Sequence, residues 1–222
     1  SVHIIIDAAT SNVTGNVTLN SGDAIGTRIG SPVTNVAGGD IEVNAGGTIA
    51  LNSAGPGNAG TIRTAGGVTL NTQSVTQGPD AVIQANTLTV NTQQGASLIG
   101  ANSVNTFSAF NALFGDVALN NSSALLTLPA VQNTGGAFQL NQSGDLLVTG
   151  LVNSGPQAIA ATGTLTVQAG ASGSSQLFSV GDQTVSAGSI LLQGGSSGNG
   201  NSASITAVGG SQTVNAGAGG IT

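Results

Sequence analysis

The side chains that could carry out acid–base chemistry are few in this chain of 222 residues. They are eight Asp and Glu residues, His3, Arg28 and Arg63, and the sequence has neither Lys nor Cys. Cleavage of a glycosidic bond uses two carboxyl groups, and chemistry on an acidic sugar also needs a cation or a histidine nearby. His3 is the single histidine and stands near the start of the chain. We therefore expect no catalytic residues and no enzyme.

The acidic residues mostly follow Gly or Pro, a context typical of solvated turns. This set comprises Asp23, Asp40, Asp80, Asp116, Asp145 and Asp182. Calcium needs six or more oxygen ligands from one neighbourhood, and the Gly-Gly-x-Gly-x-Asp repeat of calcium-bound β-rolls is missing from the sequence. Without Cys there are no thiolate ligands either. We expect no metal site and no cofactor.

A recurrent Asn is the most specific local signal. It closes short alternating segments such as Val17-Thr-Leu-Asn20 and Val117-Ala-Leu-Asn120. The full set is Asn20, Asn44, Asn52, Asn71, Asn91, Asn120 and Asn141. Such a row could contact a glycan. Asn also satisfies backbone groups in turns, however, and stacked copies form a hydrogen-bonded ladder. We interpret the set as a structural Asn ladder, because every turn of a repeating fold needs those bonds.

The elements that would carry these residues are short strands. Apolar and polar residues alternate before each Asn, as in half-buried strands. Charged residues make up 5% of the chain and Lys is absent, so exposed helix faces are not expected. At 39% hydrophobic residues and a mean hydropathy of +0.27, the chain has enough apolar residues for a core. The acidic balance, with a net charge of −6, argues against nucleic acid as a partner.

The strand segments recur at regular intervals. Gln183-Thr-Val-Ser-Ala-Gly188 returns as Gln212-Thr-Val-Asn-Ala-Gly217, and 212 minus 183 gives 29. Upstream the period is near 20, in the series Ile41, Ile62, Ile83 and in the series Asn52, Asn71, Asn91. A repeat this small must stack on the next one to bury its apolar side. The sequence predicts an all-β, right-handed, single-stranded parallel β-helix, with coils of about 20 residues that lengthen toward the C-terminus.

We expect one β-helical segment over residues 1–222. Residues 1–180 are predicted to form the coils of about 20 residues, and residues 181–222 the longer coils of period 29. Residues 115–135 align strand for strand with residues 136–155, and Thr164-Leu-Thr-Val-Gln168 is expected to stack on Leu146-Leu-Val148. Phe107 is predicted to point inward from a strand. We also expect this chain to be a segment of a longer protein.

The repeat style resembles that of a known family. Gly115-Asp-Val-Ala-Leu-Asn120, Ser143-Gly-Asp-Leu-Leu-Val-Thr-Gly150, Thr106-Phe-Ser-Ala-Phe-Asn111 and the Gly181-Asp-Gln-Thr-Val185 repeats resemble the filamentous haemagglutinin exoproteins, which Gram-negative bacteria export by two-partner secretion. The resemblance implies a long shaft that is surface-exposed or released and serves adhesion, aggregation or biofilm. The Asn-Pro-Asn motifs of the family's secretion domain are missing here, so the chain resembles the shaft.

These observations lead to one functional hypothesis and one alternative. The hypothesis is a structural shaft of a secreted or surface-exposed bacterial adhesin or extracellular fibre, with an extracellular or cell-surface location. Expected partners are neighbouring coils of the same longer chain, an end-to-end homo-assembly, and cell-surface glycans or receptors. These would be contacted through elements outside this segment or through its loops, chiefly residues 194–201. No membrane insertion is expected. The alternative is a carbohydrate-active β-helix, a polysaccharide lyase or hydrolase, and a third possibility is an ice-binding face of Thr rows.

Overall fold

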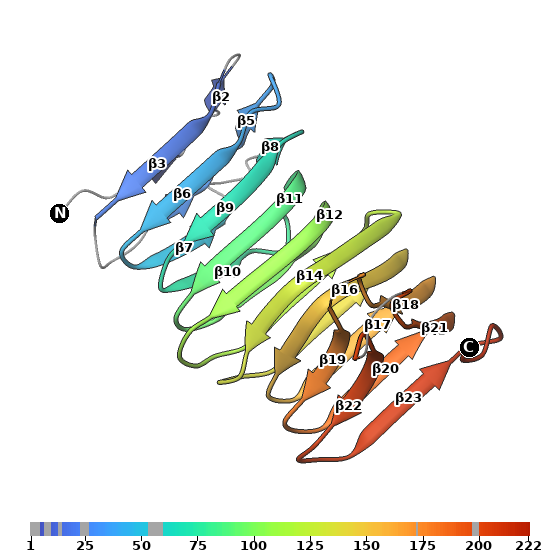
Figure 1. Ribbon diagram of the computed structural model, residues 1–222. Coiled ribbons are helices and arrows are strands. Elements are labelled where there is room, and N and C mark those ends of the chain that lie inside the picture. The colour runs from blue at the N-terminus through green and yellow to red at the C-terminus, as the bar shows by residue number, and fades with distance from the viewer. Residues whose placement is uncertain are drawn as a thin grey trace.

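The protein folds as an all-β solenoid. The computed structural model describes residues 5–6, 10–12, 15–22, 27–52, 60–171, 173–196 and 200–222, and these residues form strands, bends and turns without any helix (Figure 1). It follows that no helix in this part of the chain could cross a membrane. All strand pairings among the described residues are parallel, which confirms the predicted fold class.

Each coil contributes one strand segment to each of three faces, which we name A, B and C. Face A contains β1 (Ile5–Ile6), β4 (Thr27–Ile29), β7 (Thr48–Leu51), β10 (Ser74–Gln77), the start of β12 (Ala96–Asn111), β13 (Val117–Asn121), β15 (Phe138–Gln142), β17 (Gln157–Ala161), β20 (Gln183–Ala187) and β23 (Gln212–Ala216). Face B contains β2 (Thr10–Asn12), β5 (Val33–Asn35), β8 (Ile62–Thr64), the middle of β12, the first parts of β11 (Ile83–Thr92), β14 (Leu125–Asn133) and β16 (Asp145–Ser154), then β18 (Thr164–Gln168) and β21 (Ser189–Gln193). Face C contains β3 (Val17–Ser21), β6 (Ile41–Ala45), β9 (Gly67–Asn71), the last parts of β11, β12, β14 and β16, then β19 (Ser175–Ser179) and β22 (Ala203–Ala207).

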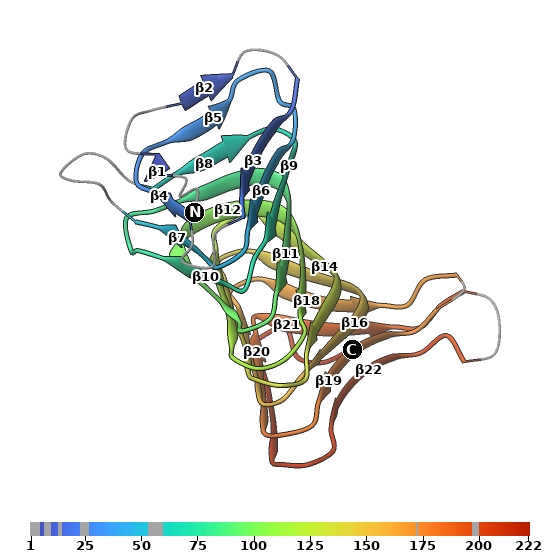
Figure 2. The ribbon, with the colours of Figure 1, turned by 90° about the vertical axis from the view of Figure 1, so that its left-hand side faces the viewer.

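The coils advance along one axis from the N-terminal strands to β23. In Figure 1 the strands of face C lie in front and run to the lower left while the coils advance to the lower right, so the helix is right-handed. Figure 2 shows the three faces around a common interior, with the segments after β18 and β21 projecting to one side. Each face is therefore a parallel sheet whose hydrogen bonds run along the axis, with coils about 4.8 Å apart.

Several predicted alignments are confirmed by the strand register. Gln183 pairs with Gln212, Val117 pairs with Phe138, and Leu146 pairs with Leu165. The repeat is 29 residues for the first of these pairs and 21 for the second (138 minus 117). Long coils also occur near the N-terminus, because Val33 pairs with Ile62, 29 positions later.

Two upstream alignments were wrong. Ile62 pairs with Ile83 as predicted, but Ile41 lies on face C, where it pairs with Val68. Asn71 pairs with Asn91 and with Asn44, whereas Asn52 follows β7 on face A. The three faces carry the same apolar–polar alternation, so an offset near 20 residues aligned segments that belong to different faces.

The interior is filled by alternate side chains of all three faces. Ile41, Ile62 and Leu140 are among the fully or almost fully buried side chains, as period-two alternation requires. Phe107 points inward from β12, as predicted, and its ring stacks on that of Phe138 with centroids 6.5 Å apart and planes 8° from parallel. Two aromatic rings, one from face C and one from face A, thus stack in the middle of the solenoid interior.

Glycine is required where coils approach most closely at the corners. A Cβ atom on Gly150 would lie 1.9 Å from the carbonyl oxygen of Pro129 in the preceding coil. Gly95 and Gly115 have φ angles of +91° and +92°, which other residues rarely adopt. The abundance of Gly therefore reflects tight turns stacked on tight turns.

Candidate functional site

Four of the seven recurrent Asn residues form a hydrogen-bonded row on face C, which we name the outer ladder: Asn20, Asn44, Asn71 and Asn91. The Nδ2 group of Asn44 donates to Asn20 Oδ1 (2.8 Å), that of Asn71 to Asn44 Oδ1 (2.6 Å), and that of Asn91 to Asn71 Oδ1 (2.8 Å). Asn71 Nδ2 also donates to Glu42 Oε1 (3.1 Å). The row faces outward, because the strand positions on either side point into the core.

The other three residues are placed elsewhere. Asn120 and Asn141 pair on face A, where Asn141 Nδ2 donates to Asn120 Oδ1 over 2.9 Å. Asn52 lies after β7, and its backbone amide donates to the carbonyl of Ile29. The recurrent Asn therefore divides into a row of four, a separate pair and one residue outside both.

A second set of amide side chains points inward, and sequence reasoning missed it. Asn121 directly follows Asn120 but is buried, and its Nδ2 donates to Gln142 Oε1 (2.8 Å) in the next coil. Asn111 Nδ2 likewise donates to Asn133 Oδ1 (2.7 Å). Two adjacent polar residues at a strand end must point to opposite sides, and this was the signal available in Asn120-Asn121 and Asn141-Gln142.

The inward amides continue toward the C-terminus as a row of Gln on face A. Gln183 Nε2 donates to Gln157 Oε1 (2.8 Å), and Gln212 Nε2 donates to Gln183 Oε1 (2.7 Å). Gln157 and Gln183 are almost completely buried. We name three groups of these inward-facing amides the inner rows: Asn111–Asn133, Asn121–Gln142 and Gln157–Gln183–Gln212, of which Gln212 lies in the last coil and is exposed.

Four of the predicted turn carboxylates accept hydrogen bonds from the backbone of the next coil. Asp40 Oδ1 accepts from Gly67 N (2.7 Å), and the Oδ1 atoms of Asp116, Asp145 and Asp182 accept from Ala137, Thr164 and Ser211 at 2.8 Å each. The same contact recurs on all three faces. These residues are thus more than solvated turn residues, because each satisfies an amide at the start of a strand in the following coil.

Three of the other titratable residues lie on different parts of the surface. Arg28 and Arg63 are exposed on faces A and B, and Asp80 is exposed in the turn before β11. His3 and Asp23 lie outside the described residues. Where the structure describes the chain, no three His, Cys, Asp or Glu residues form a group that could hold a metal ion.

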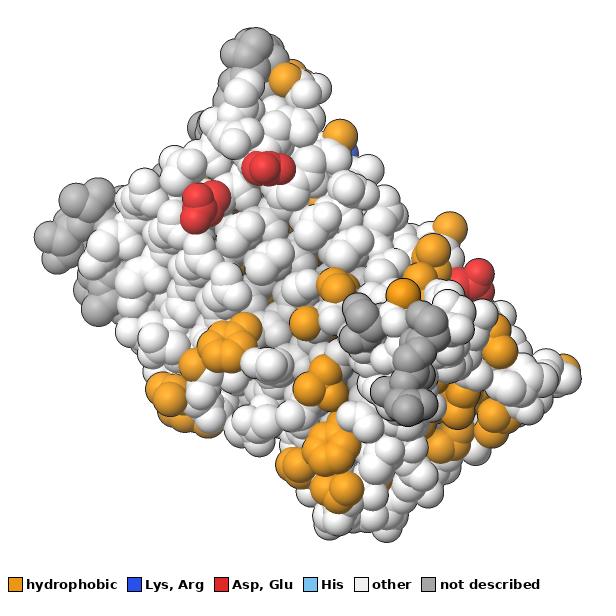
Figure 3. Space-filling model, viewed as in Figure 1, with side chains coloured by type: hydrophobic (Ala, Val, Ile, Leu, Met, Phe, Trp, Pro, Cys, Tyr) orange, Lys and Arg blue, Asp and Glu red, His pale blue; other side chains and the backbone are white. Residues whose placement is uncertain are grey.

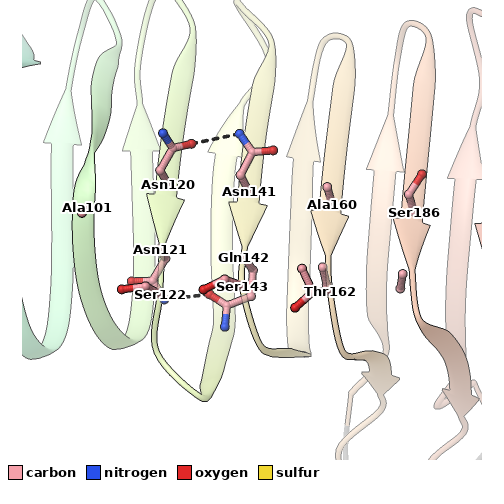
Figure 4. A pocket seen from close by; sticks show the side chains of 12 residues that line it. Ala101, Asn120, Asn121, Ser122, Asn141, Gln142, Ser143, Ala160, Thr162 and Ser186 are labelled. Atoms are coloured by element: carbon pink, nitrogen blue, oxygen red, sulfur yellow. Dashed lines mark hydrogen bonds between the residues drawn. The ribbon is translucent and has the colours of Figure 1, made fainter. Parts of the chain in front are cut away.

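Two grooves follow the axis where the chain bends after an outward Asn. The first, which we name the amide groove, runs between faces C and A, has a volume of about 560 Å³, and is lined by Asn44, Asn71, Asn91, Gln73, Gln93 and Phe110 among others. The second, the small-residue groove, has a volume of about 540 Å³ and runs from face A toward face B. Figure 4 shows Asn120, Asn141, Ala160 and Ser186 of the second groove in one row along the axis.

The face that carries the outer ladder changes character along the axis. Figure 3 shows uncharged polar side chains and two acidic ones over the N-terminal coils, whereas hydrophobic side chains gather over the C-terminal coils. Phe110 is 49% exposed and takes the ladder position after Asn91, with which it pairs in register. The outer ladder therefore meets an aromatic ring at its C-terminal side.

Comparison with protein-family models, with curated proteins and with solved structures gave no match.

Proposed function

We propose that this β-helix is the structural shaft of a secreted or surface-exposed bacterial adhesin or extracellular fibre, with a role in adhesion, aggregation or biofilm. The observation that supports the proposal most directly is the continuity of the stack. From β1 to β23 on face A, every strand pairs with the strand of the next coil, and the outer ladder and inner rows add side-chain bonds between coils.

This arrangement suits a load-bearing rod. The backbone hydrogen bonds lie along the axis, so tension along the axis is shared by the bonds of three faces at each junction between coils. Because each coil presents its backbone groups to the next, further coils of a longer chain or a second copy could continue the stack. The proposal includes membership of the filamentous haemagglutinin family and an extracellular location. Both are suggested by the resemblance in repeat style.

A deletion of one coil tests the shaft. Removal of residues 117–137 lets Phe138 take the place of Val117, with which it pairs in register. The shortened protein should fold, lose about 4.8 Å of length, and still support adhesion when it replaces this segment in the native protein on cells. Loss of adhesion with the fold intact would contradict a shaft that acts only as a spacer.

The enzymatic alternative is tested separately. The purified chain is incubated with a panel of acidic and neutral polysaccharides, and the reducing ends and unsaturated products are measured. A shaft leaves every substrate intact. Turnover that is lost on substitution of a single Asp or Arg would replace the shaft with a polysaccharide lyase or hydrolase.

A further inference from the structure

The amide groove has hydrogen-bonding capacity that the fold itself does not use. Each side-chain amide offers two donors and an acceptor, and Asn44 and Asn91 use one Nδ2 proton each within the outer ladder. In the described part of the chain, Asn91 Oδ1 accepts no hydrogen bond, and the side-chain amides of Gln73 and Gln93 make none. The groove therefore presents several unpaired donors and acceptors from successive coils.

An aromatic ring lies beside these amides. Phe110 lines the same groove, is about half exposed, and pairs in register with Asn91. A solvent-exposed Phe ring offers a flat apolar surface on which a ligand ring can pack. Amides next to an aromatic ring form a surface that suits a sugar, whose hydroxyl groups need donors and acceptors and whose C–H faces need an apolar partner.

The charge in and near the groove selects against anions. None of the residues that line it is charged, and the carboxylate of Glu42 accepts a hydrogen bond from Asn71, which is one of the lining residues. An acidic polysaccharide would have to bring its carboxylates toward Glu42 without any cation in the lining to compensate. The groove thus fits a neutral ligand.

The repeat of the groove favours a polymer over a small molecule or a peptide. Equivalent amides recur at each coil, about 4.8 Å apart along the axis. A bound peptide would gain most by pairing with a sheet edge, but the backbone groups of β6, β9 and β11 here already pair between coils. Side chains are what remains for a ligand to contact.

We propose that the amide groove binds an extended, neutral polysaccharide along the solenoid axis, with Phe110 as the stacking platform and Asn91 and Gln93 as the hydrogen-bonding groups. This places glycan contact on the body of the rod, whereas the sequence pointed to the loop of residues 194–201, of which 197–199 lie outside the described residues. The inference goes beyond a spacer role, since a shaft needs no ligand of its own.

The test uses the full chain and four defined probes in isothermal titration calorimetry: cellohexaose, xylohexaose and mannohexaose as neutral ligands, and hexagalacturonate as the anionic one. At least one neutral hexasaccharide should bind with a Kd below about 1 mM. Phe110→Ala should weaken that binding about tenfold or more. Phe114→Ala is the matched control, since Phe114 is similarly exposed but does not line the groove, and its Kd should stay within about twofold of wild type.

Three results would overturn the proposal: no binding of any neutral probe, equal binding by wild type and Phe110→Ala, or tighter binding of hexagalacturonate than of every neutral probe. Melting curves of both Phe variants establish that the fold is intact. Gln93→Ala provides a second variant that removes an unpaired amide from the surface, and it should also weaken binding. The coil deletion described above is assessed by folding and by adhesion, and not by sugar binding. A failure of sugar binding would therefore contradict the groove proposal without contradicting the shaft proposal.

Discussion

The outer ladder and the inner rows use the same chemical group on opposite sides of the same strands. Asn120 and Asn121 show the contrast within one dipeptide: Asn120 points to the surface and pairs with Asn141, whereas Asn121 points into the interior and pairs with Gln142. In water a lost amide hydrogen bond is replaced by solvent, but inside the coil its partners stay unpaired. The inward Asn121 should therefore contribute several-fold more to the free energy of unfolding than the outward Asn120.

The inner rows also show that a buried carbonyl near a corner can receive its hydrogen-bond donor from two different positions. At the corner between faces C and A, Asn133 Nδ2 donates to the carbonyl of Ala137, and the next strand begins with the apolar Phe138. One coil later Ser154 pairs with Asn133 in register and Gln157 pairs with Phe138. Gln157 Nε2 then reaches the carbonyl of Val152. Thus, where Ser154 replaces Asn133 at the corner, Gln157 replaces Phe138 at the start of the next strand and supplies the amide donor.

The largest expected effect comes from placing a charge on the inner side of a strand. Leu140 is buried in β15, and Leu140→Asp should destabilise the protein by more than about 4 kcal/mol, because the carboxylate has no partner there. Urea unfolding followed by circular dichroism measures the change. The control is Asn141→Asp, one residue later on the outer side, which should cost about 1 kcal/mol or less. Similar midpoints for both variants would contradict the inward and outward assignment.

The second largest effect is expected at Asn121, and Asn120 is its direct comparison. Asn121→Ala removes donors to Val104 O and Gln142 Oε1 and the acceptor for Val104 N, so it should cost about 3 kcal/mol. Asn120→Ala removes the bonds to Ile99 O and Asn141 at the surface and should cost about 1 kcal/mol. Both are measured by urea unfolding. If the two variants unfold at the same urea concentration, burial does not set the difference.

A smaller effect is expected at the corner carboxylates. Asp145→Ala leaves the backbone amide of Thr164 to solvent, because that bond lies at the exposed surface, and should cost about 1 kcal/mol. Asp145→Asn keeps an acceptor oxygen and should cost less than half as much. Hydrogen exchange at Thr164 gives the local readout: faster exchange is expected in the Ala variant, and an unchanged rate would mean that the carboxylate does not protect this amide.

Much of the fold could be predicted from alternation and repetition. The inward Val, Ile, Leu and Phe positions, the parallel β-helix and the 29-residue repeat at Gln183 follow from the sequence because each coil repeats the same strand pattern. The assignment of upstream strands to faces could not be predicted, since Ile41 and Ile62 sit in equivalent patterns on different faces. The amide groove escaped prediction too, because it depends on where Phe110 falls in the row that begins with Asn20.

The smallest effect concerns the outer ladder itself. Asn71→Ala removes the bonds to Asn44, Asn91 and Glu42 on the outer, half-exposed side of the strand, so it should cost about 1 kcal/mol or less. Asn71→Asp tests the contact with Glu42 more directly, because it replaces the donor to Glu42 Oε1 with a second carboxylate about 3 Å away. Repulsion between exposed charges is screened by salt, so the cost of Asn71→Asp should fall between 0.05 and 0.5 M NaCl by more than the cost of Asn71→Ala does. The double variant Glu42→Gln with Asn71→Asp should lose that salt dependence. If all three variants respond to salt alike, the contact between Glu42 and Asn71 contributes nothing, and the ladder is held by its Asn–Asn bonds alone.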